Sequence, residues 1–325
     1  MSSRIFLRTA AAAAALSLAA IGPSRAEVPA VVASIAPLHS LAAMVMDGVG
    51  SPRLLLRGSA SPHGYALRPS QRRALAEASL IVRVGPALEA FLDRPLAAQR
   101  KQGRVLDALE IPGMRRYPLR KGGVWQAAEH DHDHDHDHDR EKGHDGARDA
   151  DGTDPHIWLD PHNAGTVVAA IARRLAEIDP ANAAAYARNA ASASATLEAL
   201  ESGLRDTLTP VRDAPFVVLH DGWQYFERAF GLRGAGAIAL SPERRPGARR
   251  IAALRKHLTA AGVRCVFSEP QFPAAIVETV VRGTGSRTAP LDPLGATLSP
   301  GKALYPALMR AMAGTIADCL RPAGG

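Results

Sequence analysis

The sequence predicts an α/β protein of two lobes, with mainly parallel sheets flanked by helices, joined by one long rigid helix. Short apolar runs alternate with helical patterns in two separate stretches of the chain, as expected of βα units that build parallel sheets. A long alanine-rich segment separates the two stretches. The chain has 325 residues, of which 46% are hydrophobic, so it is long enough for two domains that each have a core.

The first lobe is predicted to comprise residues 27–180. Its apolar runs are short, and one of them, LIVRVG, closes on a glycine as buried strands often do. Pro69 favours the first turn of a helix, where its missing N–H costs nothing. We therefore expect strands at 31–35, 53–56 and 80–85, and helices at 38–48, from 69 to 77, near 87–98 and at 164–177.

The predicted linking helix covers residues 181–210, and the second lobe covers 211–325. Alanine has the highest helix propensity, and four leucines at 197, 200, 204 and 208 form one stripe at helical spacing. Pro210 and Pro215 end this helix. In the second lobe we expect strands at 216–219, 236–240, 265–268 and 287–291, and helices at 222–230, 247–261, 273–282 and 304–320.

The first 26 residues have the pattern of a signal peptide. Arg4 and Arg8 precede an uncharged apolar run at 9–21, and Ser24 and Ala26 are small residues at −3 and −1 of a cleavage point. The run is shorter than the roughly 20 residues that span a bilayer, which disfavours a retained anchor. We expect export, cleavage after Ala26 and a soluble mature protein.

The charge of the chain is unevenly distributed. Removal of three arginines with the signal lowers the net charge from +7 to +4, and residues 129–154 alone carry 11 acids against three bases. The remainder is therefore strongly basic, which could indicate nucleic-acid binding. Export and an aromatic content of 5%, too low for a stacking surface, argue against a nucleic-acid partner.

A polar segment interrupts the first lobe and contains HDHDHDHDHD at 130–139. Such a segment cannot bury enough apolar surface to offset the entropy of ordering it, so we expect a mobile His/Asp-rich loop at about 126–154. Alternating imidazoles and carboxylates offer many weak, exchangeable metal sites, whereas a solvated linker would explain the aspartates but not the histidines. The candidate low-affinity ligands are His130, His132, His134, His136, His138 and His144.

Three further histidines and one aspartate lie where ligand sites form. His63 follows a strand, His156 precedes a helix, and His220 and Asp292 end strands. Ligands of open α/β sheets bind beyond the carboxyl ends of the strands, and three imidazoles with one carboxylate suit tetrahedral Zn²⁺. Their spacing is weak evidence, because a single histidine is more often a hydrogen-bonded or surface residue. The other histidines, His39, His162 and His257, are interpreted as surface or capping residues.

No catalytic motif accompanies these residues, so the chain is not predicted to be an enzyme. The sequence contains no H-E-x-x-H, no G-x-S-x-G, no C-x-x-C and no P-loop. Glu269, in FSEPQF, could act as a general base near a metal, but a partner that orients a metal ligand is the simpler interpretation.

The chain has two cysteines, Cys265 and Cys319. An even pair in an oxidising compartment usually forms a disulfide, and two buried free thiols are the alternative.

Five motifs together resemble the metal-specific solute-binding proteins of ABC importers, most closely their zinc-receptor, ZnuA-like branch. They are SPHGYALRPS, DPHIWLDP, VVLHDGWQYFE, CVFSEPQF and LDPLG. The resemblance covers the whole mature chain and implies a periplasmic protein that captures Zn²⁺ between two lobes. It also implies an inner-membrane permease as partner, with a cytoplasmic ATPase behind it. A periplasmic zinc chaperone is a further expected partner, and we expect a monomer.

The resemblance assigns roles to individual residues. His63, His156 and His220 fall on the zinc histidines of the family, and Asp292 on its C-terminal carboxylate. A histidine at 220 indicates zinc rather than manganese, and the two cysteines match a disulfide found in part of the zinc branch. The chain departs from some members at Pro62, where they have an acid, so the fourth ligand is expected to be Asp292 or water.

Two other functions remain open on the sequence. One is a periplasmic zinc hydrolase that uses Glu269 as its base and an open position on the metal. The other is a metal buffer or chaperone that works mainly through the His-rich loop.

Overall fold

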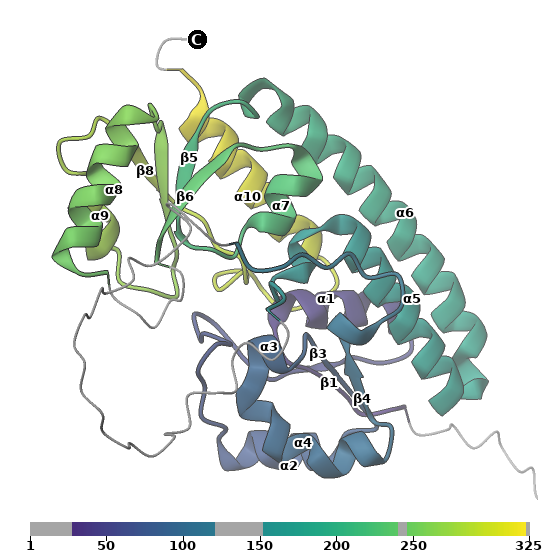
Figure 1. Ribbon diagram of the computed structural model, residues 1–325. Coiled ribbons are helices and arrows are strands. Elements are labelled where there is room, and N and C mark those ends of the chain that lie inside the picture. The colour runs from purple at the N-terminus through teal and green to yellow at the C-terminus, as the bar shows by residue number, and fades with distance from the viewer. Residues whose placement is uncertain (1–27, 121–151, 240–245, 323–325) are drawn as a thin grey trace, which may run out of the picture.

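The computed structural model describes residues 28–120, 152–239 and 246–322, which form two α/β lobes beside one long helix (Figure 1). The predicted signal peptide and the six loop histidines lie outside the described residues. Among the described residues, no helix has both the length and the hydrophobicity that crossing a membrane requires.

The sheet of the first lobe is parallel, with strand order β2-β1-β3-β4. Successive residues of its strands face opposite sides, so Val31 and Ala33 join one apolar cluster while Val32 joins another. The strands are β1 (Val31–Ala33), β2 (Arg53–Leu54), β3 (Leu80–Arg83) and β4 (Val105–Asp107); the helices are α1 (Ala36–Val45), α2 (Pro69–Glu77), α3 (Pro86–Glu89), α4 (Asp93–Lys101) and α5 (Pro161–Ile178).

The sheet of the second lobe repeats this arrangement, with parallel order β6-β5-β7-β8. Helices α8 and α9 cover one face, and α10 lies on the other (Figure 1). The strands are β5 (Phe216–His220), β6 (Gly234–Ala239), β7 (Cys265–Ser268) and β8 (Arg287–Pro290); the helices are α7 (Gln224–Phe230), α8 (Ala248–Ala260), α9 (Ala275–Val281) and α10 (Leu304–Leu320).

The long helix α6 (Ala183–Leu208) runs along both lobes (Figure 1). It packs against α5 and α1 of the first lobe and against α10 and α7 of the second. All four leucines of the predicted stripe are buried, as the helical spacing indicates. A disulfide joins Cys265 of β7 to Cys319 of α10, with the two Cα atoms 6.0 Å apart, which confirms the predicted bridge.

The ends of several elements, such as β1, α1, β2 and α5, differ by a few residues from the predicted bounds, and the structure departs further from the prediction in three places. The helix expected near 87–98 is two helices, because Pro95 lacks an N–H and is accommodated in the first turn of a new helix, α4. Strand β4 was not predicted, since it has three residues, of which two are half-buried. The predicted loop extends too far, because Asp154 at its end is 1% exposed and held by hydrogen bonds.

Candidate metal centre

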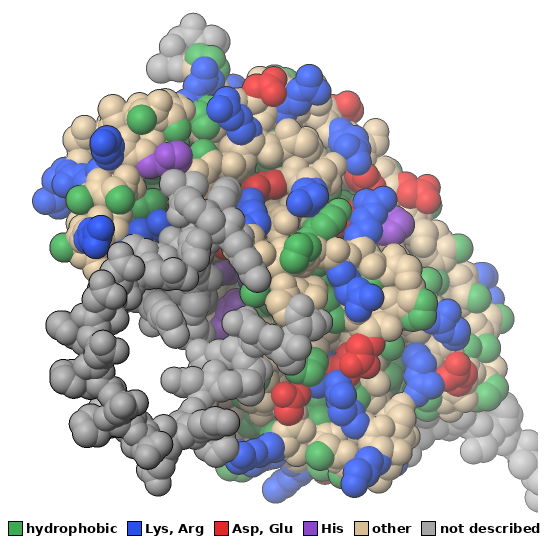
Figure 2. Space-filling view, viewed as in Figure 1, with side chains coloured by type: hydrophobic (Ala, Val, Ile, Leu, Met, Phe, Trp, Pro, Cys, Tyr) green, Lys and Arg blue, Asp and Glu red, His purple; other side chains and the backbone are tan. Residues whose placement is uncertain are grey.

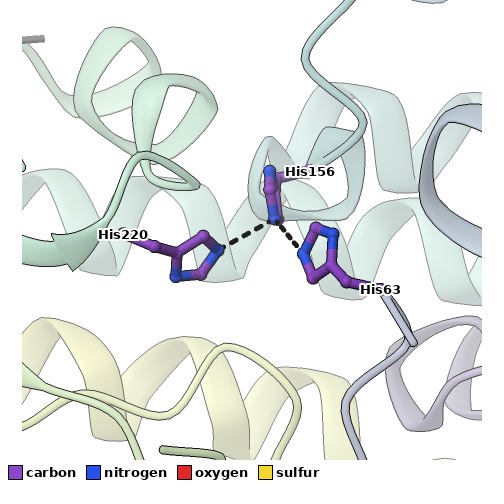
Figure 3. A group of neighbouring side chains, drawn as sticks. All are labelled: His63, His156 and His220. Carbon is purple, nitrogen blue, oxygen red and sulfur yellow. Dashed lines mark hydrogen bonds between the residues drawn. The ribbon is translucent and has the colours of Figure 1, made fainter. Parts of the chain in front are cut away.

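Three histidines from distant parts of the chain converge between the lobes (Figure 3). His63 lies on the segment between β2 and α2, His156 directly precedes a 3₁₀ turn at Ile157–Leu159, and His220 is the last residue of β5. The Nε2 atom of His156 lies 3.3 Å from that of His63 and 3.1 Å from that of His220. One potential ligand atom from each ring lies within 4.8 Å of the others.

These separations are close to those that a tetrahedral ion imposes. Two nitrogens bound at 2.0–2.1 Å and separated by the tetrahedral angle lie about 3.3–3.4 Å apart. The spacing of His156 from each of the other two rings therefore suits one small divalent ion, and the third pair lies within 4.8 Å.

A carboxylate fixes the orientation of His156. Asp154 Oδ1 lies 2.8 Å from His156 Nδ1 and also accepts the backbone N–H of His156 at 3.0 Å. Burial would raise the pKa of Asp154, but the hydrogen bonds and charge of His156 outweigh burial and hold the pKa below its usual value. An ionised Asp154 keeps the proton on Nδ1, so Nε2 presents a lone pair to the centre.

A second carboxylate orients His220 in the same way. Glu269, directly after β7, places Oε1 2.6 Å from His220 Nδ1. Burial would lower the pKa of His220, but the charge and hydrogen bond of Glu269 outweigh burial and raise it. When His220 is neutral, its Nε2 also points a lone pair toward His156.

The two oriented rings require a cation between them. Both Nδ1 atoms hold their proton toward a carboxylate, so in the neutral rings neither Nε2 can donate to the other across 3.1 Å. Two facing lone pairs at this distance repel one another unless a proton or a metal ion lies between them. The arrangement is therefore built for a positive charge.

Mostly apolar side chains surround the three histidines. Figure 2 shows histidine side chains in a hollow between the two lobes. A mostly apolar lining limits the access of bulk water and so strengthens the bonds of an ion to its ligands. The pocket is lined by Ser61, Pro62, His63, His156, Trp158, His220, Glu269, Gln271, Phe272, Pro293 and Leu294.

The structure does not bring Asp292 into this group. Asp292 Oδ1 accepts hydrogen bonds from the backbone N–H groups of Leu294 and Gly295 and from Gln271 Nε2, and Oδ2 accepts from Ala296 N. The carboxylate thus holds the turn that follows β8. Pro293 and Leu294 of that turn line the pocket, so Asp292 contributes to its wall rather than to the histidine group.

Two buried acceptor atoms beside the histidines have no hydrogen-bond partner. They are Glu269 Oε2 and Gln271 Oε1, and both residues line the pocket. Buried polar atoms are nearly always satisfied, so this pair indicates a place for a donor such as a water molecule.

Sequence reasoning missed Asp154 because the surrounding polarity indicated a loop. Its position two residues before His156, in DPHIW, was the available signal. It also missed the burial of His39, which is 7% exposed and bonded through Nε2 to Pro52 O, so the surface interpretation of this histidine was wrong.

The comparisons with known proteins agree with this geometry. The family model "ZnuA: Zinc-uptake complex component A periplasmic" matches residues 31–319. The ZnuA high-affinity zinc uptake system protein of Brucella abortus (strain 2308) is 43% identical, over 89% of this chain and 91% of that protein. The protein of the same description from Paracoccus denitrificans is 40% identical, over 95% of this chain and 96% of the relative.

Among solved structures, the chain is similar to a ZnuA deletion mutant with zinc bound. The TM-score is 0.72 at 26% identity, over 91% of this chain and all of the other. The matched region includes both lobes and all three converging histidines, so the chain belongs to the ZnuA family of periplasmic zinc-uptake components.

Proposed function

We propose that this protein captures Zn²⁺ between its two lobes in the periplasm and delivers it to the permease of an ABC importer. The permease lies in the inner membrane and is driven by a cytoplasmic ATPase, which the receptor meets only indirectly. The observation that carries the proposal is the convergence of three imidazoles, in which His156 Nε2 lies 3.3 Å and 3.1 Å from the other two Nε2 atoms and two rings are fixed by carboxylates. The relatives named for high-affinity zinc uptake support the same assignment.

His63, His156 and His220 are the proposed zinc ligands, and a solvent molecule completes the tetrahedron. All hydrogen bonds of Asp292 described above hold its own turn and Gln271, which favours solvent over the predicted Asp292 as the fourth ligand. The unpartnered Gln271 Oε1 suits a hydrogen bond from that solvent molecule.

The geometry favours binding over hydrolysis. Glu269 Oε1 is engaged by His220 Nδ1, and also receives the backbone N–H of His220 at 3.4 Å. A carboxylate held in this way orients a ligand rather than moving toward a substrate, so we propose no catalytic role for Glu269.

The remaining parts of the chain support delivery to a membrane partner. We propose that residues 1–26 direct export and are cleaved after Ala26, and that the mature protein is a monomer. The six histidines at 130–144 bind further zinc weakly and are available to a periplasmic zinc chaperone. The proposed units are the first lobe at 27–180, the linking helix at 181–210 and the second lobe at 211–325.

Metal analysis and zinc titration of two proteins test this function. One is the mature chain, and the other lacks residues 126–151 but keeps the ordered residues that follow. A receptor retains one tight zinc per chain after the deletion. A buffer or chaperone that works through the loop loses nearly all of its zinc, and that result would overturn the proposal. Zinc-dependent hydrolysis of model esters that disappears in Glu269→Gln would favour the enzyme instead.

A further inference from the structure

The chain on either side of residues 121–151 forms a short two-stranded stem, defined here as residues 117–120 and 152–154. Pro118 and Thr153 pair in an antiparallel bridge. Leu119 N donates to Gly152 O, and Asp154 N donates to Tyr117 O. The two ends therefore emerge side by side from one ordered base.

This stem is docked on α7 of the second lobe. The hydroxyl of Tyr225 accepts the backbone N–H of Tyr117 and donates to the carbonyl of Asp154. Gln224 Nε2 donates to Pro118 O and to Asp154 Oδ2. Each helix side chain thus bonds to both strands of the stem, which fixes the stem against the second lobe.

Arg120 ends the stem and binds two carboxylates of the second lobe. Its Nε lies 2.8 Å from Asp221 Oδ1, and its Nη1 lies 2.6 Å from Glu227 Oε2. Its Nη2 contacts both carboxylates as well. The side chains are 17%, 7% and 8% exposed for Arg120, Asp221 and Glu227, so the cluster is largely withdrawn from water. A planar guanidinium presents five donors in a fixed fork and can span two carboxylates in this way.

The cluster is connected to two of the three histidines. Asp221 directly follows His220 in the chain, so Arg120 holds the backbone at the end of β5. Asp154 belongs to the same stem and fixes the ring of His156. One stem therefore constrains ligands that come from different lobes.

We propose that Arg120 is a positioning residue of the zinc site, which clamps the stem to Asp221 and Glu227 and thereby sets the relative placement of His156 and His220. The inference rests on the proposed zinc-binding function. A misplaced ligand lowers the affinity of the site for its ion, most of all where few protein ligands hold that ion. Loss of the hydrogen bonds that orient metal ligands typically lowers metal affinity about 10–100-fold.

The test separates placement from charge. In the native cluster one guanidinium and two carboxylates carry a net charge of −1. Arg120→Gln leaves two carboxylates without their cation and can lower the stability of the fold. The double variant Arg120→Gln/Glu227→Gln restores the net charge of −1 but lacks the clamp, so it isolates the effect on placement. Glu227→Gln alone keeps Arg120 paired with Asp221.

Zinc affinity is measured by competition with a chelator of known affinity, and the visible spectrum of bound Co²⁺ reports the geometry of the site. We expect the double variant to bind zinc about tenfold or more weakly than the native protein, whose cluster has the same net charge, with an altered Co²⁺ spectrum. Arg100→Gln is the matched control, since it removes an arginine from the buried Asp107 far from the site, and it should change neither quantity.

Equal affinities and identical Co²⁺ spectra for the double variant and the native protein would overturn the inference. So would a loss of zinc affinity as large in Arg100→Gln, because that would show a general effect of stability. Normal zinc binding by His63→Ala, His156→Ala and His220→Ala would instead refute the proposed zinc site itself. The Arg120 variants test only the positioning role and cannot refute the site.

Discussion

Asp154 Oδ1 lies 2.8 Å from His156 Nδ1, and Asp154 Oδ2 lies 3.3 Å from Gln224 Nε2 of the second lobe. One buried carboxylate therefore orients a proposed metal ligand and also joins the two lobes. We predict that Asp154→Asn lowers zinc affinity about tenfold, because an amide supports the Nδ1 proton less strongly than a carboxylate. Zinc titration measures the effect. Asp179→Asn, which changes a buried aspartate bonded to Tyr186 and Asn182, is the control and should bind zinc normally.

The three histidines should be individually indispensable for tight binding. His63→Ala, His156→Ala and His220→Ala each remove one ligand from a centre that holds no other His, Cys, Asp or Glu among the described residues. We expect each variant to bind zinc at least about tenfold more weakly by titration. The ligand assignment is wrong if two of the three bind zinc as the native protein does.

Zinc affinity should fall as the pH is lowered. A histidine must be neutral to bind a metal, and its ordinary pKa is about 6.5. Glu269 raises the pKa of His220 above this value, so protons begin to compete with zinc at a higher pH than for a free histidine. Titrations between pH 7.5 and 5.5 should show a steady loss of affinity, first in the weak loop sites. A flat profile would contradict a histidine-based centre.

The raised pKa of His220 should make the zinc-free protein more stable as the pH is lowered, whereas zinc affinity falls as the pH is lowered. Because the pKa of His220 is raised on folding, the stability it contributes is fully present below its unfolded pKa, about 6.5. That contribution is lost as the pH rises through the folded pKa. Melting curves of zinc-free native and His220→Ala protein across this range isolate it.

The variant Asp292→Ala tests whether Asp292 holds the turn after β8 or binds the zinc ion. The substitution removes the acceptor for three backbone N–H groups and for Gln271. We expect a loss of about 1–3 kcal/mol in the free energy of unfolding, and a smaller loss of zinc affinity than in the histidine variants. Unchanged melting together with a histidine-like loss of zinc would identify Asp292 as the fourth ligand.

Zinc binding should cause little movement of the lobes. Besides α6, the lobes are joined beside the pocket, where Trp158 Nε1 donates to Pro293 O and Tyr305 OH donates to Trp158 O, both at 2.8 Å. Small-angle scattering of the zinc-free and zinc-bound protein should therefore give nearly equal radii of gyration. A decrease of the size seen when a hinged sugar receptor closes would contradict the rigid connection.

The sequence predicted most elements because their local signals agree with their surroundings. The helix at 69–77 begins at Pro69. The predicted strand at 265–268 matches β7 residue for residue, and the predicted helix at 304–320 matches α10 in the same way. The linking helix was predicted by alanine content and a leucine stripe. Strand β4 was missed because three residues, of which two are half-buried, give no readable period.

The site could be predicted only in part. His63, His156 and His220 are too far apart for spacing to indicate a centre, so the family resemblance brought them together. The environment of Asp154 depends on Gln224 and Tyr225, which follow it by about 70 positions. The sequence places Asp292 at a strand end. It does not show that the backbone N–H groups of the following turn bind the carboxylate.

The largest apolar cluster contains residues of both sheets and of α6, among them Ala33, Leu200 and Phe216. Splitting the lobes would expose this shared interior to water, at a cost that neither half could offset with its own smaller cluster. We therefore expect the two lobes to form one cooperative unit that melts in a single transition, although the fold repeats the same four-stranded plan twice. A receptor of this kind cannot release its cargo by letting one half loosen while the other stays folded.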